Sequence, residues 1–197
     1  MDQIFSALGL AIIVFASTNV DDLLILTAFF SDRRMRASSV VIGQFLGIGF
    51  LATVSVVAAL LAVAIPDGWT RLLGLAPFVL GIQRLVTLRK SQYKTAIDQT
   101  SPESCSNLAG DIVSVASTTI ANGGDNIGAT IPLFANQPGR IWFYMIVFTV
   151  MTAIWCIASF LLTKHPVIAS RLGRYGHIVL PLVLIALGLH ILFGTSS

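Results

Sequence analysis

The chain has 197 residues, of which 55% are hydrophobic and only 11% are charged, whereas soluble domains carry roughly 25% charged residues. The mean hydropathy is +0.86 and the formal net charge is +3. This composition argues against a soluble domain, a disordered chain and a nucleic-acid binder, and it predicts a protein embedded in the lipid bilayer. The two cysteines, Cys105 and Cys156, are too few for a disulfide scaffold or a thiolate metal cluster.

Six apolar stretches follow one another along the chain, each close to the roughly 20 residues that a helix needs to cross a bilayer. They are Ile4–Phe30, Val40–Ile65, Leu72–Leu88, Ile112–Phe134, Ile141–Leu162 and about Tyr175–Phe193. The sequence therefore predicts an all-α membrane protein with six transmembrane helices.

Basic residues gather in the connections after the first, third and fifth stretches. These connections and the adjacent helix ends contain Arg33, Arg34 and Arg36, then Arg84, Arg89, Lys90 and Lys94, and finally Lys164, Arg171 and Arg174; only Arg71 and Arg140 lie elsewhere. Because Lys and Arg are enriched in cytoplasmic loops, we expect these three connections in the cytoplasm and both termini outside.

The two halves of the chain share a short polar motif. A polar cytoplasmic linker, residues 89–110, separates a first three-helix repeat, residues 1–88, from a second one, residues 111–197. The pattern N-x-x-D occurs at Asn19 and Asp22 and again at Asn122 and Asp125, an offset of 103 residues. Because each repeat has an odd number of helices, the second must enter the membrane from the opposite side. This predicts inverted repeats, which many secondary transporters use to build a site near the midplane.

Three acidic residues lie far from the ends of their predicted helices: Asp21, Asp22 and Asp125. A charge at the centre of a membrane-spanning helix costs about 2.5–3.5 kcal/mol on insertion scales. The sequence places no Lys or Arg at a similar depth to neutralise them. Intramembrane carboxylates of this kind usually line the path of a cation or a proton.

The residues around these acids offer further oxygen ligands. Asn and Asp at positions i and i+3 share a helix face, so Asn19 and Asn122 each accompany a carboxylate, and the hydroxyl of Thr18 is nearby. For Thr18, a hydrogen bond to its own helix is the competing interpretation. Gly123 and Gly124 weaken the helix just before Asp125. Carboxylate, amide and hydroxyl oxygens suit hard or borderline divalent cations.

Four segments resemble the cadmium resistance transporter family, which belongs to the lysine-exporter superfamily of six-helix bacterial inner-membrane proteins. They are T-N-V-D-D-L-L-I-L-T-A-F-F (18–30), I-G-Q-F-L-G (42–47), G-L-A-P-F-V-L-G-I (74–82) and N-G-G-D-N-I-G-A-T-I-P-L-F (122–134). The resemblance implies efflux of cadmium across the plasma membrane, hence heavy-metal resistance. The metal ion is then the substrate, and no cofactor is implied. The resemblance also implies that the family's metal-binding motifs correspond to Asp21, Asp22, Asp125 and Asn126 in this chain. Gln44 is a further candidate ligand, or else an interhelical hydrogen-bond partner.

We expect a secondary transporter that exchanges a divalent cation for protons, since the chain has no G-x-x-x-x-G-K-[ST] nucleotide-binding motif. Three alternatives stay open: export of manganese or zinc, export of an amino acid, and an intramembrane aspartyl protease. The protease is the least favoured, so we expect no enzyme. The sequence does not define the oligomeric state, and a homodimer is one option.

Overall fold

The computed structural model describes residues 2–63 and 108–164, together with single helical positions between 75 and 82 and between 182 and 189. Every element in the described ranges is a helix, so the predicted all-α class is confirmed. They are α1 (Asp2–Thr18), α2 (Val20–Ser31), α3 (Ala37–Val63), α5 (Leu108–Asn122), α6 (Gly124–Asn136), the 3-10 helix η3 (Pro138–Arg140) and α7 (Ile141–Leu162).

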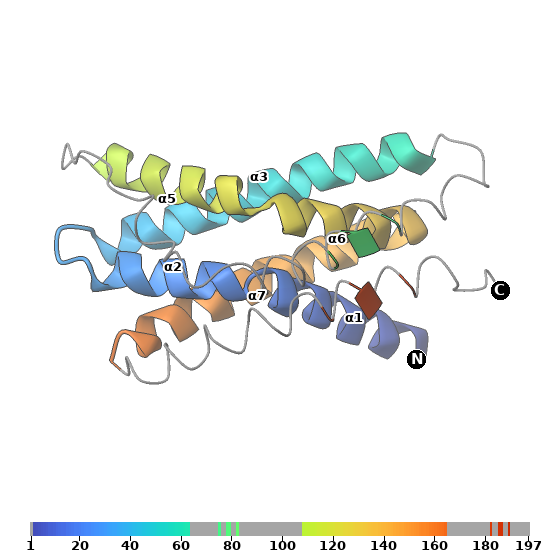
Figure 1. Ribbon diagram of the computed structural model, residues 1–197, viewed down its shortest axis with the longest axis horizontal. Coiled ribbons are helices and arrows are strands. Elements are labelled where there is room, and N and C mark those ends of the chain that lie inside the picture. Colours follow the sequence, from blue (N-terminus) through green and yellow to red (C-terminus); the bar gives the residue numbers. More distant parts are fainter. Residues whose placement is uncertain are drawn as a thin grey trace.

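The helices lie side by side with their long axes roughly aligned (Figure 1). Two stretches are long and apolar enough to cross a membrane: Ala37–Ala62 in α3, and Pro138–Leu162, which joins η3 and α7. α1 and α2 meet the same criterion as a pair bent by 57°. The described ranges therefore hold two spans, or three if the bent pair is one span. The predicted helices over 72–88 and 175–193, apart from single positions, and most of the linker lie outside the described residues, so six spans and inverted repeats remain predictions.

Two of the predicted helices are broken near their middle. The first breaks at Asn19, between α1 and α2, and the fourth breaks at Gly123, between α5 and α6. Gly123 is where the glycine pair predicted a weak helix, whereas the break at Asn19 has no comparable signal. Pro132 lies inside α6, which continues to Asn136, so the second interruption comes from Gly123 and not from the proline.

The breaks give a different correspondence between the halves from the one that the N-x-x-D motif predicts. They lie at positions 19 and 123, an offset of 104 residues, where the motif gives 103. In this register Asp21 corresponds to Asp125, and Asp22 corresponds to Asn126. In each half, both of these positions lie in the first turn of the helix that follows the break.

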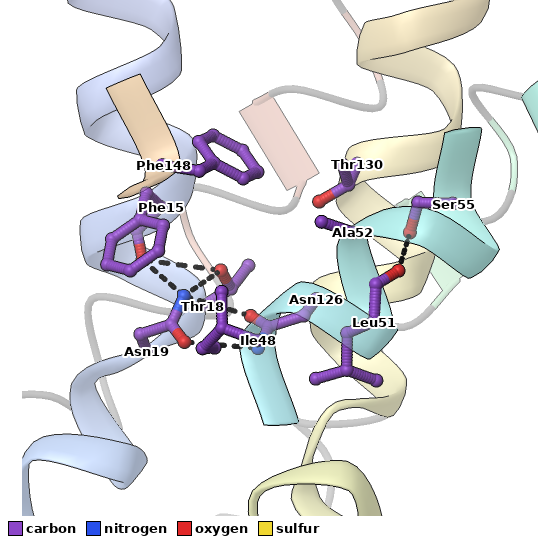
Figure 2. A pocket seen from close by; sticks show the side chains of 10 residues that line it. All are labelled: Phe15, Thr18, Asn19, Ile48, Leu51, Ala52, Ser55, Asn126, Thr130 and Phe148. Atoms are coloured by element: carbon purple, nitrogen blue, oxygen red, sulfur yellow. Dashed lines mark hydrogen bonds between the residues drawn. The ribbon is translucent and has the colours of Figure 1, made fainter. Parts of the chain in front are cut away.

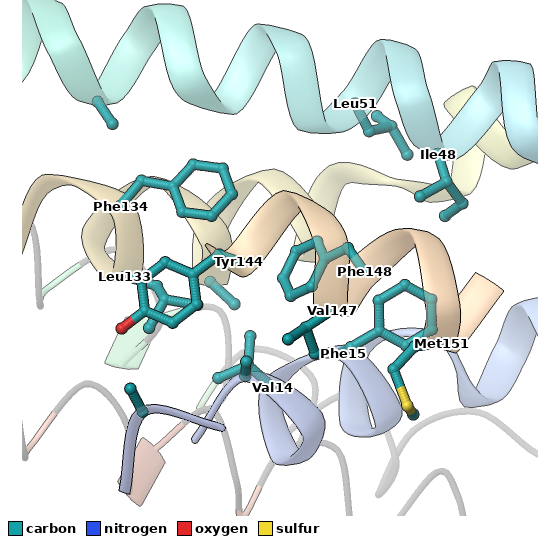
Figure 3. Packing of buried hydrophobic residues seen from close by; sticks show 14 residues of the cluster. Val14, Phe15, Ile48, Leu51, Leu133, Phe134, Tyr144, Val147, Phe148 and Met151 are labelled. Carbon is teal, nitrogen blue, oxygen red and sulfur yellow. The ribbon is translucent and has the colours of Figure 1, made fainter. Parts of the chain in front are cut away.

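Aromatic side chains from α1, α6 and α7 form the centre of the apolar core (Figure 3). The ring of Phe15 contacts those of Phe148 and Trp155 edge-on, with centroid distances of 5.3 and 5.5 Å, and Phe134 stacks on Tyr144 at 5.9 Å. These contacts fix α1 against α7 at the level of the first break, because Phe15 lies one turn before Asn19.

The outer faces of α3 and α7 are also apolar. Their exposed side chains recur at helical spacing and include Ile42, Leu46, Phe50, Val57 and Leu60 on α3 and Trp142, Ile146, Val150, Ile154 and Ile157 on α7. A soluble protein rarely exposes such continuous apolar surface. The arrangement fits helices whose outer faces contact lipid and whose polar residues point inward.

Candidate metal centre

Asp22 lies in the first turn of α2 and is 5% exposed. The side-chain Nε2 of Gln44, on α3, donates a hydrogen bond to Asp22 Oδ2 at 3.0 Å. The hydroxyl of Thr119, on α5, donates in turn to Gln44 Oε1 at 2.6 Å. Because Thr119 engages the amide oxygen, Gln44 presents its nitrogen to the carboxylate. Gln44 therefore orients Asp22, and Asp22 Oδ1 accepts no hydrogen bond from any described residue.

Close packing of α3 against α5 makes this chain of hydrogen bonds possible. A Cβ atom on Gly43 would lie 2.7 Å from Val115 Cβ, and one on Gly47 would lie 2.7 Å from Thr119 Cβ. Both distances are too short for any residue larger than glycine without movement. The two glycines flank Gln44 and bring the helices close enough for its side chain to reach both neighbours, as small residues do in membrane helix pairs.

Asp125 and Asn126 lie in the first turn of α6 and are 4% and 7% exposed. The backbone N–H of Asn126 donates to Asp125 Oδ1 at 3.0 Å. Asp21 and Asp22 occupy the equivalent turn of α2. The positive end of the helix dipole and the unpaired N–H groups of a first turn both favour a negative charge. Each break therefore stabilises the carboxylates that follow it.

A reciprocal pair of amide hydrogen bonds joins the two breaks. Asn19 Nδ2 donates to Asn126 Oδ1 at 3.2 Å, and Asn126 Nδ2 donates to Asn19 Oδ1 at 3.1 Å (Figure 2). Both side chains are buried. The backbone carbonyl of Asn19 also accepts a hydrogen bond from Trp155 Nε1, on α7, at 2.7 Å.

The structure brings some of the predicted ligands together and excludes another. Asp21 and Asp125 lie close enough to Asp22 for their charges to interact, and Asp21 is only half-buried. Asn122, by contrast, is exposed, and its Nδ2 donates to the carbonyl of Thr118 in its own helix at 3.1 Å. The structure thus places it outside the cluster, with Asn126 in the position predicted for it.

Thr18 keeps its hydroxyl within its own helix. Its Oγ1 donates to the carbonyl of Val14 at 3.0 Å and accepts from Asn19 Nδ2 at 3.1 Å. The competing interpretation of this residue, a bond to its own helix, is the one that the structure gives. Within the described ranges, no three His, Cys, Asp or Glu side chains are close enough to hold a metal ion by themselves. A cation at this site would therefore need amide or backbone oxygens besides the carboxylates.

Sequence reasoning assigned no specific contact to Thr119, and it missed Trp155 and Ser159. Ser159 Oγ donates to the carbonyl of Leu23 at 3.1 Å, one turn beyond the carbonyl that Trp155 binds. Trp155 and Ser159 are four residues apart and share one face of α7. That spacing is the only signal in the sequence, and it does not distinguish a polar contact from ordinary packing. Cys156, next to Trp155, is buried.

Apolar helices with buried carboxylates at mid-helix breaks define an integral membrane protein with an internal polar site, the architecture of many secondary transporters. The chain belongs to the cadmium resistance transporter family, because the model of that family matches residues 15–197. The match includes both breaks and all the candidate ligands described above. No curated protein and no solved structure matches the chain.

Proposed function

We propose that this membrane transporter exports a divalent heavy-metal cation, cadmium by preference, from the cytoplasm in exchange for protons. The observation that carries the proposal is the pair of buried carboxylates, Asp22 and Asp125, near each other at two helix breaks. The basic residues that the structure describes lie at helix ends and connections, in Arg33, Arg34, Arg36, Arg140 and Lys164. Among the residues that the structure describes, these basic side chains therefore lie away from the acids within the bundle, which supports a cation or protons as the charge that balances them.

Membrane voltage makes proton exchange the expected source of energy. Moving two positive charges outward against about 100 mV costs about 4.6 kcal/mol. Exchange for at least two protons cancels that charge movement. Asp22 and Asp125 supply two protonatable groups at one site, so each can release a proton when the cation arrives and take one up after it leaves. The site then lies in a bacterial plasma membrane with the Arg33–Arg36 connection in the cytoplasm.

Amino-acid export is less well supported. A zwitterionic substrate needs a cationic anchor or a free helix N-terminus for its carboxylate. The first turns of α2 and α6 point to the site, but the first carries Asp21 and Asp22 and the second carries Asp125. These positions are therefore occupied by negative charge, which repels a substrate carboxylate. Membership in a transporter family likewise does not favour proteolysis by Asp22 and Asp125.

A transport assay with matched substitutions tests the proposal. The purified protein is placed in vesicles with an acidic outside and a neutral lumen. This pH gradient should drive Cd²⁺ out of the lumen as protons enter, and the two movements are read with a dye for the metal and a dye for pH. Asp22→Asn and Asp125→Asn should abolish the flux, whereas Asp32→Asn, the same change at an exposed position after α2, should leave it intact. Metal flux that ignores the pH gradient would contradict the exchange mechanism. Equal activity in all three variants would contradict the site.

Parallel assays with Zn²⁺ and Mn²⁺ test the metal preference. The carboxylate and amide oxygens of the site bind all three ions, and oxygen ligands alone discriminate poorly in favour of cadmium. Growth of a metal-sensitive bacterial host over a range of each metal should show the largest protection with cadmium. Larger protection with manganese or zinc would assign the alternative substrate without changing the site.

A further inference from the structure

α7 binds to the first broken helix on both sides of its break. Trp155 Nε1 donates to the backbone carbonyl of Asn19 at 2.7 Å, and Ser159 Oγ donates to that of Leu23 at 3.1 Å. Before the break, the ring of Phe15 contacts that of Trp155 edge-on at 5.5 Å. Because the two hydrogen bonds end on backbone carbonyls, they hold the main chain of α2 and not a side chain that can rotate away. We call α1, α2 and α7 together the α7 unit.

α3 packs against the second broken helix along most of its length. The two backbones approach so closely that a Cβ atom added to Gly43 or Gly47 would lie 2.7 Å from a side chain of α5. At the break itself, Leu51 of α3 packs directly over Gly123, where an added Cβ atom would overlap the leucine side chain. Close-packed interfaces of this kind transmit movement and do not deform. We call α3, α5 and α6 together the α3 unit.

These two units do not follow the two halves of the chain. α7 belongs to the second half in sequence, yet it is joined to α1 and α2 of the first half. α3 belongs to the first half, yet it is joined to α5 and α6 of the second. Among the described helices, each unit therefore combines elements of both predicted repeats.

Near the carboxylates, the two units meet through side chains. Gln44 of the α3 unit donates to Asp22 of the α7 unit at 3.0 Å, and Asn19 and Asn126 exchange two hydrogen bonds across the same boundary, at 3.1 and 3.2 Å. Side-chain contacts can be exchanged for contacts with an ion while the helices stay intact. Asp22 and Asp125 lie on different units, so a cation held between them joins the units and its release frees them.

Apolar contacts between the units lie on either side of this polar level. Toward η3, Phe134 of α6 contacts Phe148 and Tyr144 of α7, both with centroid distances of 5.9 Å (Figure 3). Toward the connection between α2 and α3, a buried apolar cluster joins α2 to α3 and α5; its residues are Leu26, Phe29, Val40 and Val115. Rocking of one unit against the other can separate either contact while it keeps the other, which opens the carboxylates to one side at a time.

We propose that the α7 unit and the α3 unit move as two rigid bodies during transport, with the cation bound at the boundary between them. This inference rests on the proposed export function. Movement along the sequence halves would instead break the bonds of Trp155 and Ser159 to α2, and the close packing of α3 on α5, in every cycle. Movement of the two units keeps all of these contacts and changes only the side-chain contacts at the boundary.

Distances between spin labels test which helices move together. A chain carrying Cys105→Ser and Cys156→Ser receives pairs of labelled cysteines at exposed positions of four helices. The substitutions are Ala28→Cys on α2, Ile42→Cys on α3, Val113→Cys on α5 and Ile157→Cys on α7. Double electron–electron resonance is recorded in bilayers, once at acidic pH without metal and once at neutral pH with Cd²⁺, and exchange of Cd²⁺ for protons is measured on the same labelled chains.

The two divisions of the bundle predict opposite results. If the units move, the α2–α7 and α3–α5 distances should stay constant between the two conditions. The α2–α3 and α5–α7 distances, which join helices of the same half but of different units, should each shift by more than about 2 Å, the upper end of ordinary helix shifts at interfaces. Movement along the sequence halves gives the reverse pattern.

Ser159→Ala tests what holds the α7 unit together. This change removes the bond to the carbonyl of Leu23, so the distribution of α2–α7 distances should broaden while that of α3–α5 distances stays as in the parent. The matched control is Ser117→Ala on α5, where an exposed hydroxyl donates only to its own helix, at 3.0 Å; it should change neither distribution.

Two results would overturn the proposal: a shift of the α2–α7 or the α3–α5 distance, or four unchanged distances in chains that exchange Cd²⁺ for protons. Absence of that exchange in the unlabelled parent would instead overturn the export function on which the proposal rests.

Discussion

Gly47→Ala should disturb the carboxylate site while leaving every carboxylate and amide side chain of the site unchanged. A Cβ atom at this position would lie 2.7 Å from Thr119 Cβ and 2.8 Å from its Cγ2. Carbon atoms in ordinary contact are at least about 3.5 Å apart, so α3 and α5 must separate by about 0.8 Å. Neither contacting atom is the far end of a flexible side chain. The helices themselves must therefore move.

This separation acts directly on the hydrogen bond that fixes Gln44. The distance from Thr119 Oγ1 to Gln44 Oε1 is 2.6 Å, and a further 0.8 Å would bring it to about 3.4 Å, beyond the usual range for O–H···O bonds. Overpacking of this kind costs about 1–3 kcal/mol of stability. Gln44 then loses the contact that directs its nitrogen to Asp22, and we expect Cd²⁺ affinity to fall by about tenfold.

The matched control is Gly49→Ala, two residues further along α3, where an added Cβ would meet nothing within 4 Å. Because alanine favours a helix over glycine, this variant should be as stable as the parent or slightly more stable. Thermal unfolding in detergent and calorimetric titration with Cd²⁺ measure the two effects separately. Equal affinity and melting temperature in Gly47→Ala and Gly49→Ala would refute the role of the close packing.

Three further substitutions test other parts of the site. Gln44→Leu removes the charge-assisted hydrogen bond to Asp22, worth about 1.5–3 kcal/mol, so Cd²⁺ affinity measured by calorimetry should fall at least tenfold; unchanged affinity would show that Gln44 does not orient the carboxylate. Trp155→Phe keeps the ring but loses the 2.7 Å bond to the Asn19 carbonyl; we expect a loss of about 1 kcal/mol in unfolding free energy and slower transport, and an unaltered melting temperature would contradict this. Gly123→Ala adds a methyl group that overlaps an α3 side chain packed against the break; bacterial tolerance of cadmium should decrease, and full tolerance would mean that the break adjusts freely.

The apolar helices within residues 2–63 and 108–164 could be predicted from the sequence, because the cost of exposing polar backbone to lipid leaves few alternatives to a helix. The break at Gly123 could also be predicted, since two adjacent glycines weaken a helix locally. The break at Asn19 could not. Its carbonyl accepts a hydrogen bond from Trp155, 136 residues away, in addition to the one from the backbone N–H of Leu23, and no local pattern of residues reports such a contact.

The choice between Asn122 and Asn126 shows a second limit of sequence reasoning. The N-x-x-D motif treats Asn122 as the partner of Asn19, and helical spacing supports that assignment only if the helix is continuous. The turn at Gly123 separates Asn122 from Asp125, the acidic residue of α6. Asn122 is left on the exposed face, and Asn126 pairs with Asn19 instead. Knowledge of where the helix breaks is therefore needed before the motif can be aligned.

The breaks also account for how the bundle tolerates its acids. Burying one carboxylate at mid-membrane costs about 2.5–3.5 kcal/mol. At Asp22, the first-turn position contributes up to about 2 kcal/mol, and the hydrogen bond from Gln44 contributes about 1.5–3 kcal/mol, so one carboxylate is nearly offset by its own surroundings. What remains is the repulsion between Asp22 and Asp125, which neither a helix end nor an amide removes. In the proposed exchange, a cation between them or a proton on one of them would relieve this repulsion, and because each excludes the other, the same repulsion would link the binding of metal to the release of protons.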